Sequence, residues 1–155
     1  METCPLGSIK DVRYKTLIPS HFLNYMDKST DDAKYKKKIG ALGENVACRF
    51  LVKRGLKVLD RNYSKKWGEI DIVAKKDKIF HFIEVKTVVS RETDKYRPEE
   101  NVHYQKLKRL SRVIQTYLLD KKVSHETEWQ IDVLAVFLDI ENKKAKFRFT
   151  ENIII

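Results

Sequence analysis

The chain has 155 residues, which is enough for one globular domain and too few for two of ordinary size. Its side chains are 42% hydrophobic and 35% charged, so a core can form beneath a highly charged surface. No apolar run approaches the ~20 residues that cross a bilayer, and the first basic residues are not followed by the apolar stretch of a secretory signal, so we expect no membrane segment. Cys4 and Cys48 stand apart, without CxxC spacing or clustered histidines, which predicts no disulfide framework, no zinc site and a cytoplasmic location.

The formal net charge of +10 is concentrated in two segments. Residues 34–66 contain eleven basic and two acidic side chains, and residues 101–122 contain six basic and one acidic. The segment between them is slightly acidic. Basic blocks of this kind are typical of a protein that binds a polyanion, and solvated helix faces are the alternative explanation.

The N-terminal residues 1–33 have no clear hydrophobic periodicity and include Pro5, Gly7 and Pro19. We expect a loosely ordered extension that contributes little to the core. The folded domain is then predicted to span residues 34–150.

Hydrophobic periodicity predicts the elements of this domain. Ile39, Leu42, Val46 and Phe50 recur at helical spacing, and Gly55 is placed to end that helix. Alternating and β-rich runs predict strands, and polar segments predict turns and loops. The predicted elements are a helix over 34–54, a strand over 56–59, a basic turn over 61–66, strands over 69–74 and 79–89 joined by a turn at 75–78, a loop over 90–100, a helix over 101–120, a strand over 129–138 and an edge strand over 145–150.

This αβββαββ order indicates an α/β domain with a mixed sheet. The hairpin formed by 69–74 and 79–89 is antiparallel, and the helix over 101–120 permits a parallel crossover to the strand that follows it. We therefore expect a central mixed sheet flanked by helices.

The central hairpin contains charges that a core hairpin does not need. Asp71 lies between two isoleucines, and Glu84 and Lys86 interrupt an apolar strand. Because strand side chains alternate, Glu84 and Lys86 share one face, and a hairpin of this length can bring Asp71 opposite Glu84. Burial of such charges is costly unless they are paired or bind a metal.

Two interpretations of these charges are open. A solvent-exposed carboxylate–lysine ion pair is one, but Phe80 and Phe82 share the face of Glu84, which disfavours an exposed face. A divalent metal site is the other, because two carboxylates with waters and a backbone carbonyl suit Mg²⁺. A metal there would lower the pKa of a bound water, and the neighbouring lysine would orient the attacking water or stabilise charge on a phosphate.

A family resemblance rests on these residues. Asp71 followed by Glu84-Val85-Lys86 resembles the D…ExK half of the PD-(D/E)xK nuclease signature, whose core order, αβββαβ, is the order predicted above. More narrowly, the chain from residue 39 to about residue 138 resembles the bacterial YraN family of predicted endonucleases, which is related to Holliday-junction resolvases. The matching segments are Gly40-Ala41-Leu42-Gly43-Glu44, Ala47, Phe50-Leu51, Gly55, Asn62-Tyr63, Gly68 to Ala74 and Phe82 to Lys86.

The resemblance implies a restriction-endonuclease-like fold and a metal-dependent endonuclease. It implies that Asp71 and Glu84 bind Mg²⁺ or Mn²⁺, with the Val85 carbonyl as a third ligand. It implies that Lys86 is the catalytic lysine and that Glu44, on the first helix, completes the acidic site.

The sequence pattern alone leaves the orientation or partner of several side chains undecided. Glu44 lies at the edge of its helix's apolar stripe and faces either the sheet or solvent. Lys106 falls inside the apolar arc of the second helix, where it either extends past the core to solvent or reaches Glu84; the family tends to have a lysine here, which favours the second interpretation. Asp132 interrupts an apolar strand, where we expect a structural pairing with a lysine, and His81 is expected to be packed or at the surface.

The function predicted is hydrolysis of DNA phosphodiester bonds, with branched or processed DNA among the candidate substrates. The alternative is a nucleic-acid-binding module that has the nuclease fold without turnover, and a third is a protein whose basic blocks only solubilise it. A junction substrate would imply a homodimer with two sites. The candidate nucleic-acid-binding residues are Lys37, Lys38, Arg61, Lys65, Lys66, Lys106, Arg109 and Arg112.

Overall fold

The computed structural model describes residues 9–10, 15–24, 31–89 and 103–153. The predicted loop over 90–100 and much of the predicted extension lie outside these residues. The strands are β1 (Ile9–Lys10), β2 (Lys15–Leu17), β3 (Lys57–Lys65), β4 (Gly68–Lys76), β5 (Ile79–Val89), β6 (Trp129–Asp139) and β7 (Lys144–Thr150). The helices are α1 (Ser20–Leu23), α2 (Asp32–Lys53) and α3 (Tyr104–Asp120).

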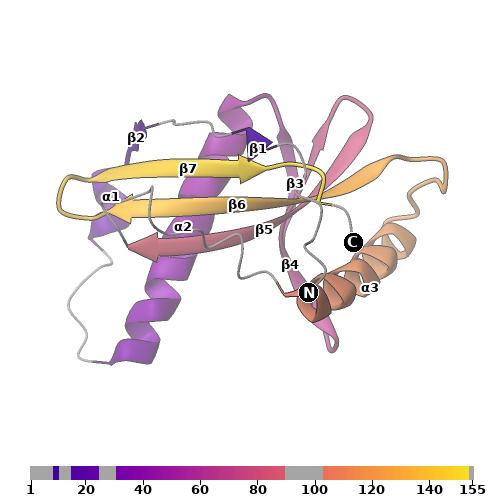
Figure 1. Cartoon of the computed structure of the whole chain (residues 1–155), viewed down its shortest axis with the longest axis horizontal. Coiled ribbons are helices and arrows are strands. Elements are labelled where there is room, and N and C mark those ends of the chain that lie inside the picture. Colours follow the sequence, from indigo (N-terminus) through magenta and orange to yellow (C-terminus); the bar gives the residue numbers. More distant parts are fainter. Residues whose placement is uncertain (1–8, 11–14, 25–30, 90–102, 154–155) are drawn as a thin grey trace.

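One mixed sheet organises the molecule (Figure 1). The strand order is β1-β7-β6-β5-β4-β3, with β2 also paired to β7. Only the β5–β6 pair is parallel among the described strands, and α3 lies in the connection between these two strands. The predicted αβββαββ order is therefore confirmed, and the mixed sheet with its flanking helices is consistent with a restriction-endonuclease-like core.

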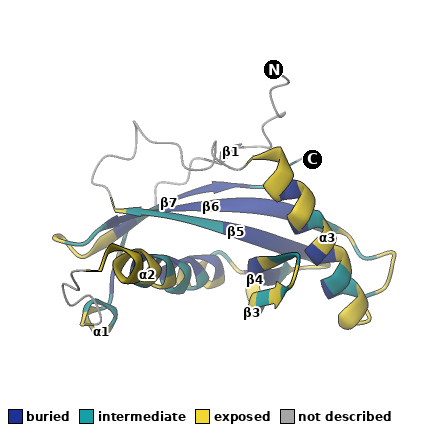
Figure 2. Cartoon of the chain, turned by 90° about the horizontal axis from the view of Figure 1, so that it is seen from below, coloured by how far each residue is buried: buried dark blue, intermediate teal, exposed yellow. Residues whose placement is uncertain are grey.

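The two long helices bury separate apolar clusters against the sheet. The buried side chains of α2 pack with those of β5, β6 and β7, and the buried side chains of α3 pack with those of β4, β5 and β6. Figure 2 shows the buried side of α2 turned toward the strands and its exposed residues turned outward. Among the described residues, none of the helices has an apolar stretch of the length that a bilayer requires.

The helix α2 approaches β5 very closely at one glycine. A Cβ on Gly43 would lie 1.8 Å from the Thr87 Oγ1 atom, so no larger residue fits without a shift of the strand or the helix. Gly40, one turn earlier, differs, because a Cβ there would meet no atom within 4 Å. Because Glu44 follows Gly43, this close contact places Glu44 beside the open end of the β4–β5 hairpin, where the two strands stop pairing.

Two sequence predictions about the elements are wrong. The basic turn predicted over 61–66 belongs largely to β3, which extends to Lys65 and pairs with β4 along its length. The polar, charged sequence suits this position because β3 is an edge strand, where charged side chains face solvent. The strand over 145–150 is not an edge strand, because β1 and β2 pair with the outer side of β7.

Part of the predicted N-terminal extension also contributes to the core. Ile18 is only 3% exposed and belongs to the α2-side cluster, and Phe22 and Leu23 pack against that cluster. Because β2 extends the sheet beyond β7, the residues that follow it cover the core at this edge. The folded domain therefore begins before residue 34.

Candidate active site

A pocket of about 420 Å³ lies at the point where β4 and β5 stop pairing. The last pair is Ile72 with Ile83, and the next residues along the two strands are Asp71 and Glu84. Residues from α2, β4, β5 and α3 line this carboxylate pocket. It brings together every residue that the sequence analysis assigned to catalysis or metal binding: Glu44, Asp71, Glu84, Val85 and Lys86.

The two central carboxylates are buried and close enough to influence each other. Asp71 is 9% exposed and Glu84 is 3% exposed. The backbone N–H of Val85 donates a hydrogen bond of 2.8 Å to the Asp71 Oδ2 atom, which ties β4 to β5 beyond their last paired residues. Burial has the largest effect on the pKa of Asp71, and the negative charge of Glu84 has the next largest. Together they raise this pKa to about 7, although the hydrogen bond from the Val85 N–H acts to lower it. The pocket therefore disfavours two negative charges unless a cation is present.

Two lysines contact the same carboxylate oxygen. The Lys86 Nζ atom lies 3.1 Å from the Glu84 Oε1 atom, and Lys106, from α3, also contacts Oε1. Partial burial alone would lower the pKa of Lys106, but the hydrogen bond to Glu84 and the charge of that residue raise it above its ordinary value. The side chain of Lys106 thus reaches Glu84 rather than extending only to solvent, which decides between the two interpretations of this residue.

The glutamate on α2 faces the pocket. Glu44 is 22% exposed, and its Oε2 atom lies 3.9 Å from the Arg61 Nη2 atom on β3. Its charge contributes to the raised pKa of Asp71. Among the described residues, no group of three or more His, Cys, Asp or Glu side chains is placed to hold a metal, so Glu44 does not form a preassembled three-carboxylate site with Asp71 and Glu84.

The donor atoms fit a hydrated Mg²⁺ or Mn²⁺. One oxygen of each buried carboxylate is held by the protein, Asp71 Oδ2 by the Val85 N–H and Glu84 Oε1 by the lysines. The other oxygen of each makes no hydrogen bond or ion pair within the described part of the chain. Mg²⁺ commonly uses one or two carboxylates and keeps several waters, so two available oxygens from a mutually repelling pair suit it.

A second pocket, of about 360 Å³, adjoins the first. Glu69, Glu84 and Lys106 line both pockets. We call the second one the basic pocket, because four of its lining residues are basic and were predicted to bind nucleic acid: Lys65, Lys66, Lys106 and Arg109.

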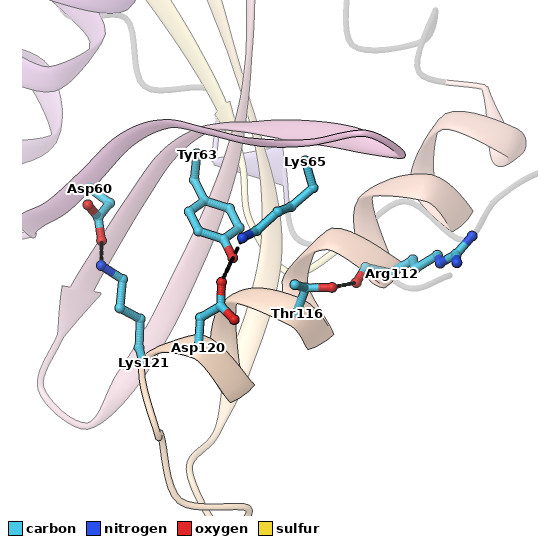
Figure 3. A network of polar contacts seen from close by, with 7 residues as sticks. All are labelled: Asp60, Tyr63, Lys65, Arg112, Thr116, Asp120 and Lys121. Carbon is cyan, nitrogen blue, oxygen red and sulfur yellow. Dashed lines mark hydrogen bonds and ion pairs between the residues drawn. The ribbon is translucent and has the colours of Figure 1, made fainter.

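Lys65 connects the basic pocket to a polar network that joins β3 to the end of α3. Figure 3 shows this network. Tyr63 donates a hydrogen bond to Asp120, and the Lys65 Nζ atom lies 2.9 Å from the Asp120 Oδ2 atom. At the same junction, Tyr117 and Lys121 contact Asp60. The ammonium of Lys65 is therefore paired within the protein, although its side chain lines the pocket.

The remaining predicted nucleic-acid-binding residues lie outside both pockets. Arg61 contacts Glu44, and the Arg112 guanidinium lies 5.1 Å from the centre of the Trp67 ring. Lys37 and Lys38 are on α2 but do not line the carboxylate pocket, whereas their neighbour Lys36 does.

Four further residues of α2 line the carboxylate pocket and were not predicted as site residues: Tyr35, Lys36, Ile39 and Gly40. The helical repeat contained the signal, since Lys36 and Gly40 precede Glu44 by eight and four residues and so share its face. Asp132 is a buried structural residue, as predicted, but its partners among the described residues are not lysines. Its Oδ2 atom lies 2.6 Å from the Nδ1 atom of His81, and its Oδ1 atom accepts hydrogen bonds from Gln130 and from the Asn152 N–H.

Comparison with known proteins identifies the family. The model of the uncharacterised protein family UPF0102 matches residues 43–136, which include Asp71, Glu84 and Lys86. The chain belongs to the UPF0102 family. A UPF0102 protein of Campylobacter jejuni strain 81-176 is 40% identical over 114 residues, which cover 74% of this chain and 91% of that protein. A UPF0102 protein of Dictyoglomus turgidum is 35% identical over 116 residues, covering 75% and 96%. UPF0102 is the YraN family, so the resemblance noted in the sequence is confirmed, and the names of these relatives state no activity.

Proposed function

We propose that this UPF0102 protein is a metal-dependent endonuclease that hydrolyses phosphodiester bonds in DNA. The observation that supports it best is the carboxylate pocket, where Asp71 and Glu84 are buried side by side and each has one oxygen available. Lys86 lies at the same pocket. A pair of carboxylates that repel each other is costly to bury, so a pocket that keeps both is suited to a cation.

The chain's own residues have distinct roles in this proposal. Bound Mg²⁺ or Mn²⁺, held by Asp71, Glu84 and the Val85 carbonyl, would supply a water of lowered pKa and neutralise charge on the phosphate. Lys86 is 28% exposed, so its ammonium is accessible at the pocket while it contacts Glu84. From there it orients the attacking water or stabilises charge on the scissile phosphate.

A nucleic acid is the favoured polyanion because Asp71, Glu84 and Lys86 lie between the two basic blocks of the sequence, and the nuclease resemblance favours DNA. The block over 34–66 includes α2 and β3, and the block over 101–122 includes α3. Lysine and arginine contacts to phosphates supply most sequence-independent affinity for nucleic acid. Branched or processed DNA remains a candidate substrate, and cleavage of a junction would require two copies of the site in a homodimer.

A nucleic-acid-binding module without turnover is the second candidate. The contacts of Glu84 favour it, because Lys86 and Lys106 already neutralise this carboxylate without a metal. In that case the same pocket would be a stable ion-pair cluster, and the basic surface would bind nucleic acid alone.

A cleavage assay separates the two. Purified protein is incubated with branched, flapped, single-stranded and duplex DNA in Mg²⁺, in Mn²⁺ and in EDTA. The endonuclease predicts cleavage of at least one substrate class in a metal and none in EDTA. Binding that depends on salt, with no cleavage of any substrate in either metal, would favour the binding module.

A further inference from the structure

The basic pocket contains two cations that no described residue neutralises. Lys66 and Arg109 line it, are exposed, and make no hydrogen bond or ion pair with any residue in the described ranges. This separates them from Lys65, which is paired with Asp120. Two unpaired cations beside a pocket are placed to bind an anion from outside the protein.

The segments that carry these two cations pack against each other. Lys66 follows β3 in the turn to β4, and Arg109 is on α3. The start of β4, directly after this turn, packs closely on α3, because a Cβ on Gly68 would lie 2.9 Å from a methyl group of Val113. Arg112 also covers the Trp67 ring at 5.1 Å. The β3–β4 connection and α3 are therefore in contact beside the pocket.

The basic pocket opens on the proposed site of cleavage. Lys106 lines both pockets and contacts Glu84, so its ammonium lies at their boundary. When the scissile phosphate of a DNA strand lies in the carboxylate pocket, the neighbouring phosphates of that strand are within reach of the residues that line the adjoining basic pocket.

We propose that the basic pocket is a subsite for a flanking phosphate of the bound strand, with Lys66 and Arg109 as its main contacts and Lys106 shared between that phosphate and Glu84. This inference rests on the proposed function, since it takes the carboxylate pocket as the place of the scissile phosphate. The ligand is a nucleic-acid phosphate, and the subsite fixes the path of the strand across the β3–β4 turn and α3.

Glu69 places a negative charge beside the same pocket. Its exposed carboxylate lines both pockets and has no partner among the described residues, so it repels a phosphate in the subsite. Removing that charge should strengthen binding of the strand, whereas removing Lys66 and Arg109 should weaken it.

The test measures the binding of a single-stranded oligonucleotide in EDTA at several salt concentrations. The double variant Lys66→Gln/Arg109→Gln should bind about tenfold more weakly, and the salt slope should fall by roughly 1. The matched control, Lys57→Gln/Lys144→Gln, removes two exposed lysines that line neither pocket and should change both quantities much less. Glu69→Gln should bind more tightly than wild type. All three should keep the wild-type melting temperature, because the changed residues are exposed.

Equal losses of affinity and slope in the double variant and its control would overturn the subsite. So would weaker binding by Glu69→Gln. Failure of the wild-type protein to bind the oligonucleotide would contradict both the subsite and the proposed function. Cleavage in Mg²⁺ is measured separately with saturating DNA. If the wild-type protein does not cleave but the variants show the expected differences in binding, only the endonuclease activity is contradicted, and the phosphate subsite is retained.

Discussion

Lys106 on α3 contacts the buried carboxylate of Glu84 on β5, and this contact links α3 to the proposed metal site. Lys106 therefore acts as a counter-charge to Glu84 in the metal-free protein. A metal that binds Glu84 must share this carboxylate with the ammonium, so each cation weakens the binding of the other.

Lys106→Gln should consequently bind Mn²⁺ several-fold more tightly than wild type, measured by isothermal titration calorimetry without DNA. The control is Lys108→Gln, which removes the same charge from an exposed position on α3 that lines neither pocket. Equal Mn²⁺ affinities of the two variants would show that Lys106 does not compete for Glu84.

Asp71→Asn should stabilise the metal-free protein above neutral pH. The pKa of Asp71 is raised from 3.8 to about 7 in the folded protein, so the folded state holds this proton more tightly than the unfolded chain. The stabilisation from that proton is present below the unfolded pKa and is lost as the pH rises toward 7. Asparagine removes the charge and can still accept the hydrogen bond from the Val85 N–H.

Thermal denaturation in EDTA checks this. The variant should melt several degrees above wild type at pH 8, since about 1 kcal/mol corresponds to roughly 2–4 °C for a chain of this size, and the two should converge near pH 4. Asp77→Asn, in the exposed turn between β4 and β5, is the control and should show no such pH dependence. A pH-independent difference, or destabilisation at pH 8, would contradict the buried carboxylate pair.

Two glycines on α2 should respond oppositely to alanine. At Gly40 a Cβ meets no atom within 4 Å, so Gly40→Ala should stabilise the protein by about 0.5–1 kcal/mol through helix propensity. At Gly43 a Cβ would overlap Thr87, so Gly43→Ala should destabilise it. Urea denaturation measures both, and stabilisation by Gly43→Ala would show that α2 lies farther from β5 than described.

The segment before α2 should matter for stability. Ile18 is 3% exposed within the α2-side cluster, so Ile18→Ala should cost about 2–5 kcal/mol, the range for truncation of a buried Ile. Leu17→Ala, at a neighbouring side chain that is 72% exposed, should cost little. Equal, small effects in urea denaturation would support the original expectation that residues 1–33 contribute little to the core.

Local patterns predicted the domain's strands and helices because each element has its own hydrophobic period. The span of β5 and the grouping of Asp71, Glu84 and Lys86 followed from alternation along a hairpin. Long-range pairing did not follow from such patterns. The pairing of β2 with β7, which buries Ile18, and the contact of His81 with Asp132 depend on which strands become neighbours, and no local period reports that.

The predicted nucleic-acid-binding residues differ in whether they form ion pairs within the protein, for the same reason. Lys65 and Lys66 are adjacent and chemically alike, yet Lys65 is paired with Asp120, 55 positions later in the chain, while Lys66 has no partner among the described residues. A count of charges along the sequence cannot separate them. The tertiary fold does, because it brings the end of α3 beside β3.

In the proposed function, Asp71 and Glu84 hold a catalytic metal and Lys86 acts beside it. The most direct measurement compares the cleavage rates of wild type, Glu84→Gln and Lys86→Ala on the DNA that wild type cleaves best, with Mn²⁺ affinity measured on the same preparations. We predict that both variants lose cleavage and that Glu84→Gln also loses Mn²⁺ affinity. Lys86→Ala should bind Mn²⁺ at least as tightly as wild type, because Lys86 also contacts Glu84. Cleavage by Glu84→Gln at the wild-type rate would contradict the account, because the activity would then come from elsewhere.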